Sequence, residues 1–326
     1  MAKCEARCWL TVFYSTFLIL LITAIGSIVI VSCAWDLRGE ILNKNYKRKL
    51  ASLPVESANI LICGDSRAER QVNSDLMTKL TDLKTLNIAS GGLHIVTVVN
   101  GLEKKQLPRP QQILLISMSS SQVNDAHSNE ILGNPAILTE MTPSQQWQLY
   151  HGQINFLLQL KAKIYYDYFR NRNLPKEEFI RNFPESGFLG IDGFIERQDV
   201  SMEKIANHTW YTDIIFPGVM AEIVYRSIAR LARNSNVIVF YNPPVCQSFY
   251  TNIKESKIDY FEREFSTAIA EEVGKYPNVY FIDYYGHPGL MSDNMYYDMQ
   301  HLNRQGAECF TRLLCRDLQD IGILGK

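Results

Sequence analysis

The sequence predicts an α/β protein in which a parallel sheet carries helices on both faces. Two observations lead to this class. Short apolar runs of strand length alternate with helical segments in both halves of the chain, and the early runs end at turns that contain serine and glycine. Such alternation is typical of parallel sheets, because the connection between two parallel strands usually contains a helix. A chain of 326 residues fits one such domain together with an anchor and an insertion.

The first half of the predicted domain contains three strands. The run Asn59–Cys63 is too short for a helix and ends at Gly64-Asp65-Ser66, so it is predicted to be a buried strand that leads into a turn. The segments after it alternate in the same way: helix Ala68–Leu80, strand Lys84–Ile88, a helix beginning near His94, and strand Gln112–Met118.

The alternation is interrupted between residues 131 and 216 and then resumes. The interruption contains a predicted long helix, Ser144–Arg170, that is dense in aromatic residues. These aromatic side chains either belong to the core or form an inserted lid or substrate platform, because insertions on an α/β scaffold often carry specificity. The later elements are helix Gly218–Arg233, strand Asn236–Tyr241, helix Ile258–Gly274, strand Asn278–Asp283 and helix Arg304–Asp320.

An apolar segment near the N-terminus predicts a membrane anchor. Residues Trp9–Trp35 contain no charge and exceed the roughly 20 residues that cross a bilayer as a helix. A cleaved signal peptide is a rival, although its apolar region is usually about 7–15 residues long. Lipidation is a second rival, because Ile30-Val31-Ser32-Cys33 is similar to a bacterial lipoprotein signal. The predicted organisation is an anchor (1–35), a charged and helical connector (36–54) and a catalytic domain (55–326) with its insertion at about 131–216.

Charge and histidine spacing exclude several classes of ligand. The 33 Lys and Arg residues balance 34 Asp and Glu residues, so a nucleic-acid partner is not expected. The histidines show no spacing typical of metal ligands, so no metal and no cofactor are expected. More positive charge follows the apolar segment than precedes it, which by itself favours a cytoplasmic domain and permits an intracellular lipase or thioesterase.

Three residues suggest nucleophilic acyl transfer. Ser66 lies just beyond the first predicted strand, which would fix its position while the turn exposes its hydroxyl. Near the other end of the chain, Asp298 and His301 are three residues apart in one predicted turn. This spacing lets a carboxylate orient a histidine toward a serine from another strand. Separately, each residue is equally well explained as a turn or surface residue, but together they predict a Ser-His-Asp triad.

The order of these blocks resembles that of the SGNH/GDSL hydrolases. The resemblance rests on Gly64-Asp65-Ser66, on Asn87-Ile88-Ala89-Ser90-Gly91-Gly92, and on Asp298-x-x-His301. It implies a flavodoxin-like three-layer fold from about Val55 to the C-terminus, with the insertion outside it. It also implies that Ser66 attacks an ester, that His301 transfers the proton and that Asp298 orients His301. The backbone N–H groups of Ser66 and of Gly91 or Gly92 would then hold the oxyanion.

The third family block departs from the pattern. Where a Gly-x-Asn is expected, the chain has Ser117 to Asp125, so the resemblance leaves the remaining oxyanion donor to Asn124 or to Ser119 or Ser120. Either the protein is an esterase or O-acyltransferase, or it has lost turnover and serves as a membrane-tethered binding or assembly factor in envelope polysaccharide modification.

A finer resemblance is to membrane-anchored proteins of bacterial envelope O-acylation, such as the Dlt-type D-alanyl transfer protein and the alginate O-acetylation proteins. It rests on the N-terminal apolar helix, Tyr241-Asn242-Pro243-Pro244-Val245 and His301-Leu302-Asn303-x-x-Gly306. It implies an extracytoplasmic domain, an acylated carbohydrate or lipid substrate, and a membrane-bound acyl-donor protein as partner.

Overall fold

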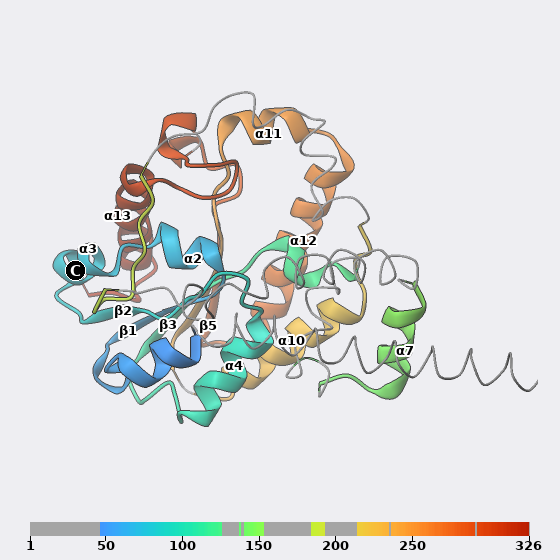
Figure 1. Ribbon diagram of the computed structural model, residues 1–326, viewed down its shortest axis with the longest axis horizontal. Coiled ribbons are helices and arrows are strands. Elements are labelled where there is room, and N and C mark those ends of the chain that lie inside the picture. Colours follow the sequence, from blue (N-terminus) through green and yellow to red (C-terminus); the bar gives the residue numbers. More distant parts are fainter. Residues whose placement is uncertain are drawn as a thin grey trace, which may run out of the picture.

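The protein contains one parallel sheet of five strands (Figure 1). The computed structural model describes residues 46–125, 137, 140–152, 184–192, 214–234, 236–290 and 292–325. The strands are β1 (Ile60–Cys63), β2 (Thr85–Asn87), β3 (Ile113–Ser117), β4 (Ile238–Asn242) and β5 (Val279–Asp283). Their order is β2-β1-β3-β4-β5 and every neighbouring pair is parallel. This is the strand order of flavodoxin-like doubly wound proteins, so the predicted α/β class is confirmed.

Alternate strand residues enter two separate cores, one on each face of the sheet. One core contains Leu61, Leu114 and Phe240, and the other contains Leu115 and Val239. The first face is covered by α4 (Ile95–Lys104), α10 (Val219–Ala232) and α12 (Lys257–Val273). The second is covered by α2 (Ser66–Gln71), α3 (Ser74–Thr81), α11 (Gln247–Ile253) and α13 (Arg304–Asp320). The sheet is therefore the middle of three layers, as Figure 1 shows.

Two helices replace the single helix predicted over Ala68–Leu80. Helix α2 ends at Gln71, and Val72 is extended with φ −110° and ψ 109°. Asn73 then caps α3, because its side chain accepts a hydrogen bond from the N–H of Leu76. The break turns the chain within a segment whose apolar spacing is continuous in the sequence.

The other predicted elements agree with the structure to within a few residues, with two exceptions. Helix α11 was not predicted, and α7 (Pro143–Gly152) is the described part of the helix predicted over Ser144–Arg170. The later residues of that predicted helix lie outside the described residues. Residues 46–52 are helical and belong to the predicted connector.

One part of the predicted insertion packs against the domain. The N–H of Asn87, in edge strand β2, donates to the carbonyl of Ser186 at 2.8 Å. The N–H of Leu189 donates to the carbonyl of Glu69 in α2, and the N–H of Arg304 donates to the carbonyl of Ile191. Residues 184–192 therefore pass along the β2 edge, toward the start of α13.

The predicted anchor, Trp9–Trp35, lies outside the described residues. Among the helices that the structure does describe, none has both the length and the apolar character needed to cross a bilayer.

Candidate active site

Ser66 is held by a tight connection between β1 and α2. Gly64 has φ +131°, and a Cβ atom there would lie 2.9 Å from Cβ of Ser117, so a larger residue does not fit. Asp65 caps the helix, since its Oδ1 accepts a hydrogen bond from the N–H of Arg67 at 2.9 Å. Ser66 therefore begins α2 at the carboxyl edge of the sheet, where ligands bind in open α/β folds.

Asp298 and His301 are positioned by a short loop before α13. Tyr296 and Leu302 form an antiparallel bridge that closes this loop. Within it, Oδ1 of Asp298 accepts hydrogen bonds from the N–H of Gln300 at 2.9 Å and from the N–H of His301 at 2.8 Å. The carboxylate is thus fixed by backbone donors before it meets the imidazole.

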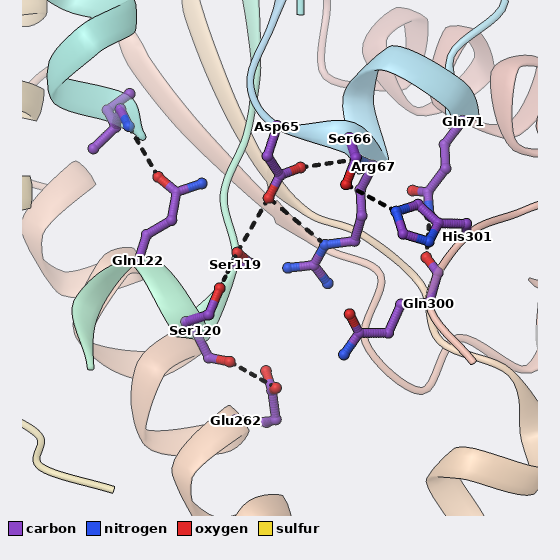
Figure 2. A network of polar contacts seen from close by, with 12 residues as sticks. Asp65, Ser66, Arg67, Gln71, Ser119, Ser120, Gln122, Glu262, Gln300 and His301 are labelled. Carbon is purple, nitrogen blue, oxygen red and sulfur yellow. Dashed lines mark hydrogen bonds and ion pairs between the residues drawn. The ribbon is translucent and has the colours of Figure 1, made fainter. Parts of the chain in front are cut away.

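The structure brings Ser66, His301 and Asp298 into one hydrogen-bonded chain. Nε2 of His301 lies 2.8 Å from Oγ of Ser66, and Nδ1 lies 2.8 Å from Oδ2 of Asp298. A carboxylate beside Nδ1 favours the tautomer with its proton on that nitrogen, which leaves Nε2 free to accept the serine proton. Figure 2 shows the imidazole facing Ser66 across the start of α2.

Asp298 is held in its ionised form. Its partial burial acts to raise the pKa, but the hydrogen bond and charge of His301 and the two backbone N–H groups outweigh burial and lower the pKa below its usual value of 3.8. Asp298 therefore keeps its negative charge at neutral pH, where it can stabilise a protonated His301.

The predicted oxyanion donors differ in their availability. Gly91 lies beside Ser66, because a Cβ atom on Gly91 would be 3.7 Å from Cβ of Ser66. Its N–H, however, donates to Oε2 of Glu69 at 3.2 Å. The N–H groups of Ser66 and Gly92 make no hydrogen bond within the described part of the chain. Of the two glycines, Gly92 therefore has the open donor.

Asn124 joins the segment after β3 to the residues that precede α10. It is fully buried, and its Oδ1 accepts a hydrogen bond from the N–H of Ile215 at 2.9 Å. The next residue, Asp125, accepts hydrogen bonds from the N–H groups of Val219 and Met220 at the start of α10. These contacts give the side-chain oxygen of Asn124 a packing role, and its predicted role as an oxyanion donor, which would use the amide nitrogen, stays a prediction.

The serines of the third block form a buried polar network beneath Ser66. The Ser119 hydroxyl donates to Oδ2 of Asp65 at 3.3 Å and lies 2.9 Å from the hydroxyl of Ser121. The Ser120 hydroxyl donates to Glu262 at 2.7 Å. Figure 2 shows that Ser119, unlike Ser120, reaches toward the start of α2. Ser119 therefore supports the turn that carries Ser66.

His94 has a structural role. It caps α4, with Nδ1 accepting from the N–H of Val96, and its Nε2 lies 3.0 Å from the carbonyl of Gln122. Nε2 therefore carries the proton. Burial lowers the pKa of His94 from 6.5 to about 4, so the ring is neutral at pH 7.

This buried histidine predicts a loss of stability in mild acid. The unfolded chain binds a proton near pH 6.5 and the folded protein only near pH 4, so stability falls as the pH is lowered through this interval. The expected loss from His94 is about 3 kcal/mol. Urea unfolding at several pH values checks this, with His94→Gln as the comparison. Equal pH dependence in both proteins would contradict the prediction.

Sequence reasoning missed three charged residues around Ser66. Lys49, Glu69 and Arg67 are all buried, although a lysine, a glutamate and an arginine in helical segments usually lie on the surface. The position of Arg67, directly after the candidate nucleophile, was the one available signal.

Within the described residues, His, Cys, Asp and Glu side chains form no group of three that would suit a metal ion.

Comparisons with solved structures give distant likenesses. No family model and no curated protein matches the sequence. A solved structure from Streptococcus pneumonia, provisionally described as a platelet activating factor, is 12% identical with a TM-score of 0.44; the match covers 91% of this chain and 98% of that one. The protein YxiM of Bacillus subtilis is 15% identical with a TM-score of 0.40, over 84% of this chain and 59% of that chain. Likenesses this distant add nothing to the chemistry of the side chains.

Proposed function

We propose that the protein is a serine esterase or O-acyltransferase of the SGNH/GDSL type. The observation that carries this proposal is the hydrogen-bonded chain from Asp298 through His301 to Ser66 at the carboxyl edge of the parallel sheet. A hydroxyl, a base and a group that orients the base are the three parts that serine acyl transfer requires.

The proposed reaction passes through an acyl-enzyme. Oγ of Ser66 attacks the ester carbonyl while Nε2 of His301 takes its proton, and Asp298 stabilises the resulting imidazolium. The open N–H groups of Ser66 and Gly92 hold the oxyanion. His301 then returns the proton to the departing alcohol. Water, or a hydroxyl of an acceptor, next attacks the acyl group with His301 again acting as base, and Ser66 is regenerated.

The proposal extends to a membrane-anchored protein of envelope modification. It is supported by the charge-free segment Trp9–Trp35 and by the blocks Tyr241-Asn242-Pro243-Pro244-Val245 and His301-Leu302-Asn303. The catalytic domain would then lie outside the cytoplasm, act on an acylated carbohydrate or lipid, and take its acyl group from a membrane-bound partner. A topology reporter fused after Lys326 tests the orientation, and a cytoplasmic signal would contradict it.

Covalent labelling tests the chemical proposal directly. A fluorophosphonate forms a bond to a serine oxygen only where a base activates it, so the full-length protein is expected to carry an adduct on Ser66 alone. Peptide mapping by mass spectrometry locates the adduct. Ser66→Ala provides the control and is expected to remain unlabelled. Folded native protein that stays unlabelled, while a known serine esterase reacts, would contradict the proposal.

A second candidate function is a catalytically weakened, membrane-tethered binding or assembly factor. One observation favours it: the N–H of Gly91, a predicted oxyanion donor, is already bonded to Glu69. Losing one oxyanion donor costs on the order of 100- to 1,000-fold in rate. An unlabelled Ser66 together with retained substrate binding would support this second function.

A further inference from the structure

Arg67 places a buried positive charge next to the candidate nucleophile. Its side chain is only 7% exposed, although it belongs to the first turn of α2. The nearest carboxylate oxygen is Oδ2 of Asp65, 4.0 Å from Nε, which is too long for a hydrogen bond. Within the described residues, the guanidinium group forms no hydrogen bond.

Asp65 is engaged by other donors. Its Oδ1 accepts from the backbone N–H of Arg67, and its Oδ2 accepts from the hydroxyl of Ser119. The remaining carboxylate drawn in Figure 2, that of Glu262, accepts from Ser120. Asp65 therefore reduces the electrostatic cost of burying Arg67 without accepting a hydrogen bond from its guanidinium group.

The position of the guanidinium indicates where a partner would bind. Figure 2 shows it pointing away from α2, into the space between Ser119 and Gln300, below Ser66 as drawn. A guanidinium cannot release its proton in a protein, and a buried charge without a hydrogen-bonded partner is unfavourable. Arg70 on the same helix is more exposed than Arg67, so more water reaches it.

We propose that Arg67 binds an anionic group of the substrate, so that the substrate is an ester that also carries a carboxylate. This inference rests on the proposed function and narrows its substrate class. The two outer nitrogens of a guanidinium match the two oxygens of a carboxylate and bind them side by side. A permanent cation is best matched by an anion that is present throughout binding, such as a carboxylate of the substrate. The oxyanion is transient and consists of a single oxygen, which the N–H of Ser66 can bind.

Paired esters test the inference in the full-length protein purified in detergent. For a carboxylate on the alcohol side, kcat/KM is compared between 3-acetoxybenzoate and its methyl ester. For a carboxylate on the acyl side, phenyl hydrogen adipate is compared with its methyl ester. The variants are Arg67→Gln, Arg67→Lys and, as the matched control on the same helix, Arg70→Gln.

The quantity measured is the preference for the charged member of each pair. In one of the pairs, Arg67→Gln is expected to lower this preference by roughly 10- to 100-fold, as for loss of a charged hydrogen-bonded pair. Arg67→Lys should retain part of it, and Arg70→Gln all of it. The inference is wrong if Arg67→Gln leaves the preference unchanged in both pairs. This includes the case in which kcat/KM falls by the same factor for the charged and the uncharged ester of each pair. Equal losses would indicate a role in folding or in holding the oxyanion.

Two further measurements separate this inference from the proposed function. Labelling of native Ser66 by the fluorophosphonate reports the nucleophile independently of any carboxylate. If the native protein hydrolyses none of the four esters, calorimetric binding of 3-acetoxybenzoate and of phenyl hydrogen adipate to Ser66→Ala decides the matter. One of them is expected to bind, with at least a tenfold loss in Ser66→Ala/Arg67→Gln. Absence of binding, or equal binding to both variants, would overturn the inference.

Discussion

Replacing His301 with alanine is expected to lower kcat/KM for a simple ester such as phenyl acetate by about 10⁴- to 10⁶-fold. The variant removes the base whose Nε2 lies 2.8 Å from Oγ of Ser66. Without it the hydroxyl keeps its proton and is a poor nucleophile at neutral pH. Steady-state kinetics measure the loss, and the rate of fluorophosphonate labelling should fall in parallel because it depends on the same activated oxygen.

His287→Ala is the matched control for this experiment. His287 packs against the ring of Tyr284, and its Nδ1 accepts from the N–H of Gly289. Its loss is expected to change kcat/KM by less than about threefold, since a side chain outside the reacting groups removes no transition-state contact. A His301→Ala variant that keeps more than a tenth of native activity would show that another group activates Ser66.

The fold was predictable because its signals are local. Strands such as β1 and β3 are buried on both faces, so they appear in the sequence as uninterrupted apolar runs next to turn residues. The division between α2 and α3 was not predictable from apolar spacing, because the helices share one apolar face across the break. The division is evident only in the structure, where the side chain of Asn73 accepts a hydrogen bond from the N–H of Leu76 and so caps α3.

The grouping of Ser66, Asp298 and His301 was predictable because the residues lie in two short turns. Ser66 follows the first strand, and Asp298 and His301 share one turn before the last helix. The surroundings of Ser66 were not. Glu69 has no sequence pattern that distinguishes it from a surface residue, yet it binds the N–H of Gly91, 22 residues further along the chain. Packing across the fold determines which donor each buried carboxylate accepts from. A single sequence contains no information about these pairs.

The second large effect is expected at Lys49, where replacement by methionine should lower the free energy of unfolding by about 3–5 kcal/mol. The Lys49 and Glu69 side chains are 1% and 3% exposed, and Nζ lies 3.1 Å from Oε1 of Glu69. Nζ also donates to the carbonyls of Ala89 and Gly187 at 2.6 and 3.0 Å. Methionine fills similar space but leaves the carboxylate and both carbonyls without this donor. Urea unfolding followed by circular dichroism measures the loss.

The effect of Lys49→Met depends on burial, and two further variants establish this. Arg316→Gln removes an ion pair to Asp317 in which the arginine side chain is 63% exposed, so it should cost less than about 1 kcal/mol. Lys49→Met/Glu69→Gln removes the stranded charge and should recover part of the lost stability. A cost for Lys49→Met no larger than that for Arg316→Gln would mean that the residues around Glu69 rearrange to solvate it.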